Sequence, residues 1–193
     1  MLFRSNKMEF SCSSKRWLLP SELEDQSIKK DFGIGLHVPG TFDKVIDIKQ
    51  CEIMPSLGNK ILDDVRKFIV KSGLPAYHLR SHEGFWRFLM LRHSVAFDTW
   101  MVNVVTREKN HEVVQELAGI LSKKYPEIAS VMNNITDAKS GVSIGKEEIC
   151  LYGRDFIKEN WGNLNLKFLQ IHFFRPIQNL VKNYMAKSLN MQH

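Results

Sequence analysis

The first part of the chain alternates apolar and polar residues at the period of β-strands. Residues 3–13 form one such segment, and residues 32–40 and 42–51 form two more, joined by a turn at Pro39-Gly40. Residues 13–31 are polar and charged, so we expect a loop or a short exposed turn there. The pattern therefore predicts three strands in this part of the chain.

Two later segments have apolar residues at the three- and four-residue spacing of an amphipathic helix. The first opens at Pro55 and stops at Gly73, shortly before Pro75. The second spans residues 110–125 and ends in two lysines ahead of Pro126. The apolar stripes consist of Ile61, Leu62, Val65, Phe68 and Ile69 in the first helix and Val113, Val114, Leu117, Ile120 and Leu121 in the second.

A hairpin is predicted between the two helices, at residues 84–94 and 97–106. Both faces of its first strand are largely apolar, which is typical of a strand in the centre of a sheet. Residues 128–136 and 147–153 predict further strands, separated by a loop. Alternation resumes from Leu164 to Phe168.

This order of elements predicts an α+β fold. We expect a mostly antiparallel sheet with helices packed on one face and a split β-α-β-like core. Such an arrangement leaves the other face of the sheet free. A free face or rim that carries Lys7, Arg87, Arg92 and Arg107 would suit RNA, although the same residues also fit ordinary surface charges.

Charge and composition exclude few classes of protein function. The 193 residues include 27 Lys and Arg against 21 Asp and Glu, giving a net charge of +6 and a pI near 9.2. This excess fits a phosphate-bearing partner, and it also fits a basic protein without one. No apolar run reaches the roughly 20 residues of a membrane-spanning helix, and the N-terminus lacks the features of a signal peptide. We expect no membrane partner, and the oligomeric state stays open.

The three cysteines are far apart and form no CxxC motif: they are Cys12, Cys51 and Cys150. This spacing argues against a zinc site and a disulfide framework, and it suits a reducing compartment, so we expect the cytoplasm. The glycines of "GIG" at residues 33–35 lie in a strand pattern, without the strand-to-helix context of a dinucleotide loop. The residues alone give no complete active site.

Several blocks of the sequence resemble one family. "NKMEFS", "FDKVIDIKQC", "SGLPAYHLRSHEGFWRFLMLR", "MVNVVT", "SVMNNITDAKSG" and "LYGRDFI" are similar, in order and spacing, to blocks of the S-adenosylmethionine-dependent RNA uracil-5-methyltransferases. These enzymes modify uridines of ribosomal RNA and transfer RNA. The resemblance extends to Asn165 and implies that residues 1–165 are the central domain, which helps to hold the RNA.

The resemblance also implies what lies outside that domain. Family members usually have an oligonucleotide-binding-like barrel before it, in many cases with three clustered iron–sulfur cysteines. A Rossmann-like domain follows, with the S-adenosylmethionine site, the nucleophilic cysteine and a general base. We therefore expect no catalytic residue and no cofactor in this chain, which alone would be inactive.

The resemblance assigns roles to particular positions. Cys51 matches the fourth iron–sulfur ligand, but its three partners are absent, so we expect a free thiol. Lys7 matches the basic residue of the family's "YRNK" opening, and Arg4 takes the part of its arginine, although "FRSNK" is one residue longer. The RNA-binding candidates from the central domain are Arg87, Arg92, Asn103 and Asn134. These four would contact phosphate or base, or else brace loops against the sheet.

The end of the chain departs from the family pattern. The family continues with a stretch like "FKISPNSFFQTN", where this chain has "KFLQIHFFRPIQ". Codons exist for Asn165 to Tyr184 which, read from the third base of the first codon, spell FKISPNSFFQTNTKLGEKLY. We therefore expect residues 166–193 to be an out-of-frame tail, poorly packed or forming a fortuitous helix from Pro176.

Two functions follow from these observations. The chain is either a fragment of an RNA (uracil-5-)-methyltransferase that binds RNA weakly, or a stand-alone RNA-binding or adaptor module derived from the same domain. An active enzyme would need a donor site and a nucleophile that the sequence does not display.

Overall fold

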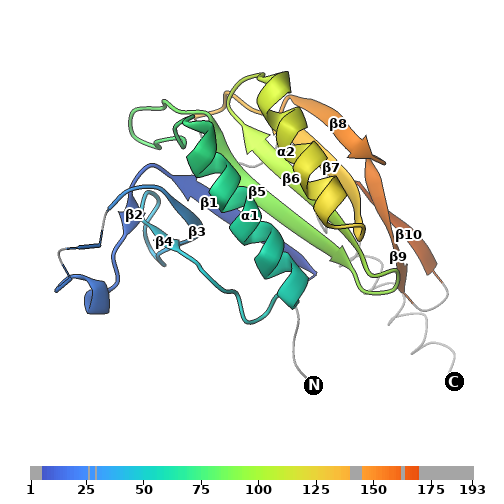
Figure 1. Cartoon of the computed structure of the whole chain (residues 1–193), viewed down its shortest axis with the longest axis horizontal. Coiled ribbons are helices and arrows are strands. Elements are labelled where there is room, and N and C mark those ends of the chain that lie inside the picture. The colour runs from blue at the N-terminus through green and yellow to red at the C-terminus, as the bar shows by residue number, and fades with distance from the viewer. Residues whose placement is uncertain (1–5, 26, 29, 140–144, 162–163, 170–193) are drawn as a thin grey trace, which may run out of the picture.

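The computed structural model describes residues 6–25, 27–28, 30–139, 145–161 and 164–169. Within them, eight strands form one sheet in the order β2-β4-β3-β1-β5-β6-β7-β8, and two more strands form a separate pair. Helices α1 and α2 lie side by side on one face of the large sheet (Figure 1). The strands are β1 (Lys7–Ser13), β2 (Arg16–Trp17), β3 (Gly33–His37), β4 (Val45–Asp47), β5 (Trp86–Ser94), β6 (Thr99–Thr106), β7 (Ile128–Ile135), β8 (Glu147–Gly153), β9 (Phe156–Trp161) and β10 (Leu164–Leu169).

The centre of the sheet is formed by β1, β5 and β6. β5 pairs antiparallel with both neighbours, and both of its faces are buried, as its two-sided apolar pattern predicts. β6 and β7 run parallel and are connected through α2 (His111–Lys124). The α+β class with a mostly antiparallel sheet is therefore confirmed.

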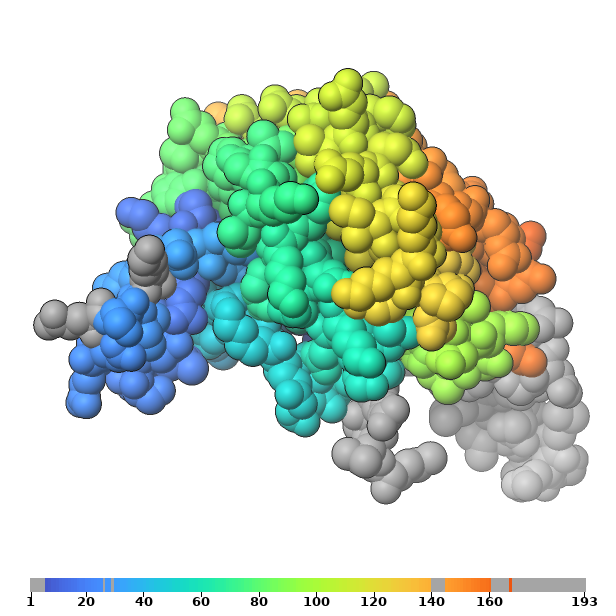
Figure 2. Space-filling model, viewed as in Figure 1, coloured from blue at the N-terminus to red at the C-terminus, as the bar shows by residue number. Residues whose placement is uncertain are grey.

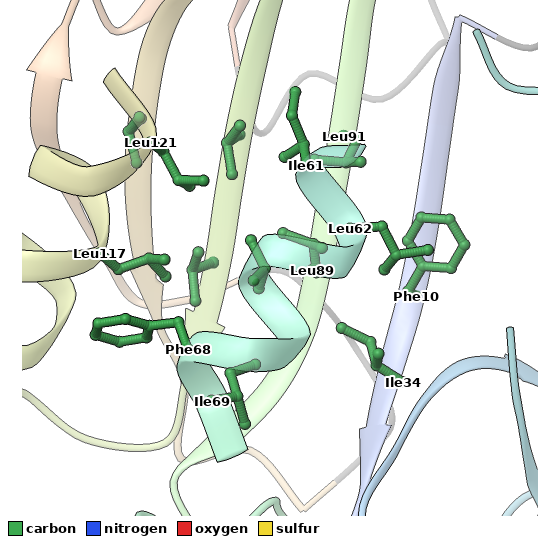
Figure 3. Close-up of a cluster of buried hydrophobic side chains, with 14 of the residues drawn as sticks. Phe10, Ile34, Ile61, Leu62, Phe68, Ile69, Leu89, Leu91, Leu117 and Leu121 are labelled. Carbon is green, nitrogen blue, oxygen red and sulfur yellow. The ribbon is translucent and has the colours of Figure 1, made fainter. Parts of the chain in front are cut away.

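The helices begin and end close to the predicted positions. α1 (Ser56–Ser72) has Pro55 as its N-cap, one residue before the first turn, and ends at Gly73, whose φ of 68° is the left-handed conformation that glycine favours. Its apolar stripe packs on Phe10, Ile34 and Leu89 of the sheet, while Leu117 and Leu121 of α2 extend the same core (Figure 3).

The close packing of β3 against β4 explains the "GIG" segment. A Cβ on Gly35 would lie 1.9 Å from the carbonyl oxygen of Ile46, and a Cβ on Gly33 would lie 2.7 Å from the Cβ of Arg16. Such approaches exclude a larger residue unless the strands move apart. These glycines therefore serve strand packing.

Two parts of the fold differ from the sequence-based expectation. Residues 13–31 are not only a loop, because Arg16 and Trp17 form β2, parallel to β4 at one edge of the sheet. In addition, the second face of the sheet is not free. β9, which the sequence pattern did not predict, packs there, and Ile157 is buried with Met101 and Met132.

The expected boundary after Asn165 falls within a strand. β10 pairs with β9 over six residues, from Leu164 opposite Trp161 to Leu169 opposite Phe156. The first four residues of the expected tail thus continue a regular antiparallel pair, and the poor packing of the tail stays a prediction. Residues 170–193 and Arg4 lie outside the described residues.

Candidate nucleic-acid interface

A cavity of about 380 Å³ lies beside the edge of the sheet formed by β2 and β4. Its walls come from β1, the segment that follows it, the β3–β4 turn and the loop between α1 and β5. In Figures 1 and 2 the N-terminal strands occupy one end of the molecule, and β8 to β10 occupy the other. A volume of this size falls within the range of ligand sites.

The lining of the cavity is strongly basic. Asp43 is the one acidic residue among the lining side chains in the described part of the chain. The basic residues are Lys15, Arg16, Lys30, Lys44, Arg80 and Arg87. Clefts that carry one sign of charge concentrate ligands of the opposite sign. The cavity therefore favours an anion.

Two of these cations are held in ion pairs that shape the walls. Arg16 lies 2.9 Å from Glu22 Oε1, and Arg80 donates from its Nε to Asp43 Oδ2 at 2.7 Å. Each pair ties a loop to a neighbouring segment. Among the described residues, no ion pair engages Lys15, Lys30 or Lys44.

An aromatic side chain stands at the edge strand. Trp17 is 43% exposed, and the Lys44 Nζ atom lies 3.9 Å from the centroid of its ring. A cation over an aromatic face is attracted by the negative charge density of the ring. Basic groups next to an exposed aromatic ring are the combination that binds unpaired nucleic-acid bases and their phosphates.

Arg87 lies at the wall of the cavity and is 1% exposed. One guanidinium nitrogen donates to the carbonyl oxygens of Thr136 at 2.9 Å and Ala138 at 2.7 Å, and the group lies 4.1 Å from the Tyr77 ring centroid. Burial lowers the pKa of this arginine. These contacts hold the segment after β7 against β5, as expected of a residue that braces a loop against the sheet.

The other predicted RNA contacts do not gather at the cavity. Along the β1–β5 pair, Ser11 lies opposite Phe88 at the cavity, whereas Lys7 lies opposite Arg92 at the far end of the pair, roughly 14 Å away. Lys7 is half-buried and donates to Glu9 at 3.3 Å; burial lowers its pKa, and the Glu9 carboxylate opposes that shift.

The remaining candidates are buried in the sheet. Arg92 is 3% exposed, and burial lowers its pKa. Asn103 and Asn134 are each 1% exposed, and the Asn103 amide has no hydrogen-bonding partner within the described part of the chain. Contact between these three side chains and RNA stays a prediction. RNA would reach such buried side chains only if the residues packed over them moved aside.

Cys51 lacks the surroundings of an iron–sulfur ligand. It is buried, and its backbone N–H donates to Asn59 Oδ1 at 2.8 Å. Among the residues that the structure describes, no group of three or more His, Cys, Asp or Glu side chains is placed to hold a metal. The described residues therefore offer Cys51 no set of partner ligands, and its state as a free thiol outside any cluster stays a prediction.

Sequence reasoning missed Trp17, Lys44 and Lys30. All three lie in segments that were interpreted by their backbone pattern, as a loop or as strand ends. The available signal was compositional, because "SSKRW" puts an aromatic residue directly after two cations. Only the structure brings this segment beside the β3–β4 turn, through the parallel pairing of Trp17 with Ile46.

Within the described residues, no helix has the length and hydropathy needed to cross a membrane.

No protein-family model matches the chain. It is nevertheless 38% identical over 173 residues to an uncharacterized RNA methyltransferase of Chlorobaculum tepidum, covering 88% of this chain and 36% of that protein. A second uncharacterized RNA methyltransferase, of Porphyromonas gingivalis, is 35% identical over 88% of this chain and 38% of its own length.

One relative has a more specific name. The tRNA (uracil(54)-C(5))-methyltransferase of Pyrococcus horikoshii is 29% identical over 78% of this chain and 36% of that protein. The crystal structure of the Pyrococcus abyssi tRNA (uracil-54, C5)-methyltransferase in complex with S-adenosyl-L-homocysteine superposes with a TM-score of 0.66 at 20% identity. It covers 95% of this chain and 40% of that chain, and shows a shared fold. The chain's relatives are RNA methyltransferases, and it spans little more than a third of the length of each.

Proposed function

We propose that this chain is the RNA-holding domain of an S-adenosylmethionine-dependent RNA (uracil-5-)-methyltransferase, acting on ribosomal or transfer RNA in the cytoplasm. The observation that carries the proposal is the cavity beside β2 and β4, with six basic side chains and an exposed indole. The names of the relatives support it, because two independent bacterial relatives are RNA methyltransferases and an archaeal one acts on a uracil.

The proposal assigns RNA binding, and not chemistry, to this chain. Phosphates of the RNA would lie against Lys15, Lys30 and Lys44, whose ammonium groups act as point charges. We place the S-adenosylmethionine site and the catalytic nucleophile outside residues 1–165. Cys12, which lines the cavity, does not serve as a nucleophile, because burial raises its pKa to about 12 and keeps it a thiol.

Salt-dependent RNA binding tests the proposal. The purified chain is titrated into a fluorescent, uridine-containing RNA stem-loop at several salt concentrations, followed by anisotropy. Changing Lys15 and Lys30 together to Ala should weaken binding and reduce the slope of log affinity against log salt by about 1.4, since each single-strand phosphate contact contributes about 0.7. Lys123→Ala, an exposed lysine at the end of α2, is the control. Equal losses in both variants, or no binding by the unaltered chain, would contradict the proposal.

The frame shift near Asn165 is part of the same proposal and is tested separately. The coding DNA downstream of this codon, read in the alternative frame, should encode a glycine-rich donor loop and a catalytic cysteine. The purified chain should then not bind S-adenosylmethionine, which calorimetric titration would show directly. If no such continuation exists in any frame, the chain is a stand-alone RNA-binding or adaptor module.

A further inference from the structure

The exposed indole of Trp17 is unusual for this protein. Of the tryptophans whose side chains the structure describes, Trp86 and Trp100 are fully buried, and both belong to the apolar core. Trp17 instead stands on an edge strand, outside that core, and lines the cavity. Single exposed apolar residues are common on protein surfaces, so the position of Trp17 at the cavity, and not its exposure alone, points to a ligand. Its position is explained if a ligand covers it.

Backbone hydrogen bonds hold the segment that carries this ring. Trp17 pairs with Ile46 of β4, and the neighbouring Arg16 donates its backbone N–H to Asp31 at 2.9 Å. The Arg16 side chain is in turn held by Glu22 at 2.9 Å. The indole is therefore carried by a segment that is already hydrogen-bonded, so that little backbone freedom is lost when a ligand stacks on it.

The surroundings of the ring identify the ligand chemistry. The Lys44 ammonium lies 3.9 Å from the ring centroid, and Lys15 and Lys30 line the same cavity. A nucleotide fits both the ring and the lysines, because its planar base can stack on the indole while its phosphate pairs with the ammonium groups. An acidic peptide would satisfy the charges alone.

We propose that Trp17, together with Lys44, forms a stacking subsite for one unpaired base of the RNA substrate, separate from the uridine that is methylated. This inference rests on the proposed function and makes it more specific. The base must be unpaired, because in a duplex both faces of a base are covered by its stacked neighbours, and double-stranded RNA is bound through its backbone and minor groove.

Binding of matched single-stranded and duplex RNAs tests the subsite. Trp17→Ala should weaken binding of a short single-stranded RNA about tenfold, as expected for loss of one base–aromatic stack, and leave binding of a duplex of the same sequence unchanged. Trp17→Phe should restore most of the affinity. Phe97→Ala is the matched control, because Phe97 is 46% exposed on the β5–β6 turn, away from the cavity lining.

Fluorescence gives a second measurement that folding alone would not change. Single-stranded RNA should quench the tryptophan emission of the unaltered chain, and this quenching should be largely lost in Trp17→Phe, which keeps an aromatic ring and the fold. If RNA binds but Trp17→Ala behaves like Phe97→Ala, the subsite is refuted and the proposed RNA binding stands. If the unaltered chain binds neither the single-stranded RNA nor the duplex, or binds polyglutamate but no RNA, the proposed function itself fails.

Discussion

Arg66 of α1 donates a hydrogen bond to Asp47 Oδ1 of β4 at 3.0 Å, and this pair ties the first helix to the edge of the sheet that carries the cavity. Asp47 also accepts the backbone N–H of Ile34 at 3.0 Å and lies 2.6 Å from Lys49 Nζ. Burial by itself would raise the pKa of Asp47, but these hydrogen bonds and the nearby cations outweigh it, so its pKa lies below the usual value of an aspartate.

Asp47→Asn should destabilise the protein by about 3 kcal/mol at pH 7, because Arg66 loses its buried partner. A carboxylate with a lowered pKa in the folded state stabilises above its unfolded pKa, near 3.8, and that contribution is lost as the pH falls through the lower folded value. The difference in the free energy of unfolding between Asp47→Asn and the unaltered chain should therefore shrink only when the pH falls below the pKa of an unfolded aspartate. Urea unfolding at pH 7, 5 and 3 measures it. Asp137→Asn, which alters an exposed pair with Lys146, should change stability by less than about 0.5 kcal/mol.

Arg87→Met should lower stability by about 3 kcal/mol through loss of two charge-assisted hydrogen bonds and the contact with Tyr77. Thermal unfolding measures this change. The salt slope of RNA binding decides between bracing and phosphate contact. A folded Arg87→Met protein with an unchanged slope supports bracing, whereas a slope reduced by about 0.7 would make Arg87 a phosphate ligand.

Gly35→Ala should be strongly destabilising, by about 3 kcal/mol or more, since its Cβ would collide with the backbone of Ile46. Gly119→Ala is the natural comparison. This glycine lies inside α2, nothing lies within 4 Å of the place that an added Cβ would take, and the change should stabilise by roughly 0.5–1 kcal/mol. Denaturant midpoints give both values, and equal effects of the two substitutions would refute the close approach of β3 to β4.

One thiol should react before the others. Cys150 is exposed, whereas Cys12 and Cys51 are buried. Partial desolvation and the nearby Asp155 carboxylate raise the pKa of Cys150, so its reaction with a disulfide reagent should be slow at pH 7 and faster in alkali. Cys150→Ser should remove this first phase and leave two thiols that react only after unfolding. A second rapid thiol in the native protein would contradict the burial of Cys12 or Cys51.

The elements that the sequence predicted share a strong and regular apolar pattern. β1 buries Met8 and Phe10 on the predicted side, and the two-sided apolar pattern of β5 correctly indicated a central strand. Local periodicity is sufficient in these cases because each element buries one face or both faces against the same core.

β9 and the cavity could not be predicted in this way. "FIKENW" buries Ile157 and Glu159, an alternation too short to distinguish from a loop, and Glu159 is buried because it accepts the backbone N–H groups of Val95 and Ala96. The cavity depends on the pairing of β2 with β4, two segments whose contact no local pattern encodes. The resemblance marks Arg87 as a candidate either for RNA contact or for bracing, but its burial depends on partners far along the chain, at Thr136 and Ala138.

The pairing of β1 with β5 has a consequence for how the protein is made. Lys7 lies opposite Arg92, so the N-terminal strand finds its central partner only after roughly 80 further residues have been synthesised. Until then it can pair only with β3, at its C-terminal end, while α1 can already form locally. The hairpin of β5 and β6 closes over a short turn, and should therefore assemble before β1 docks. The strand made first would thus be among the last to complete its pairing.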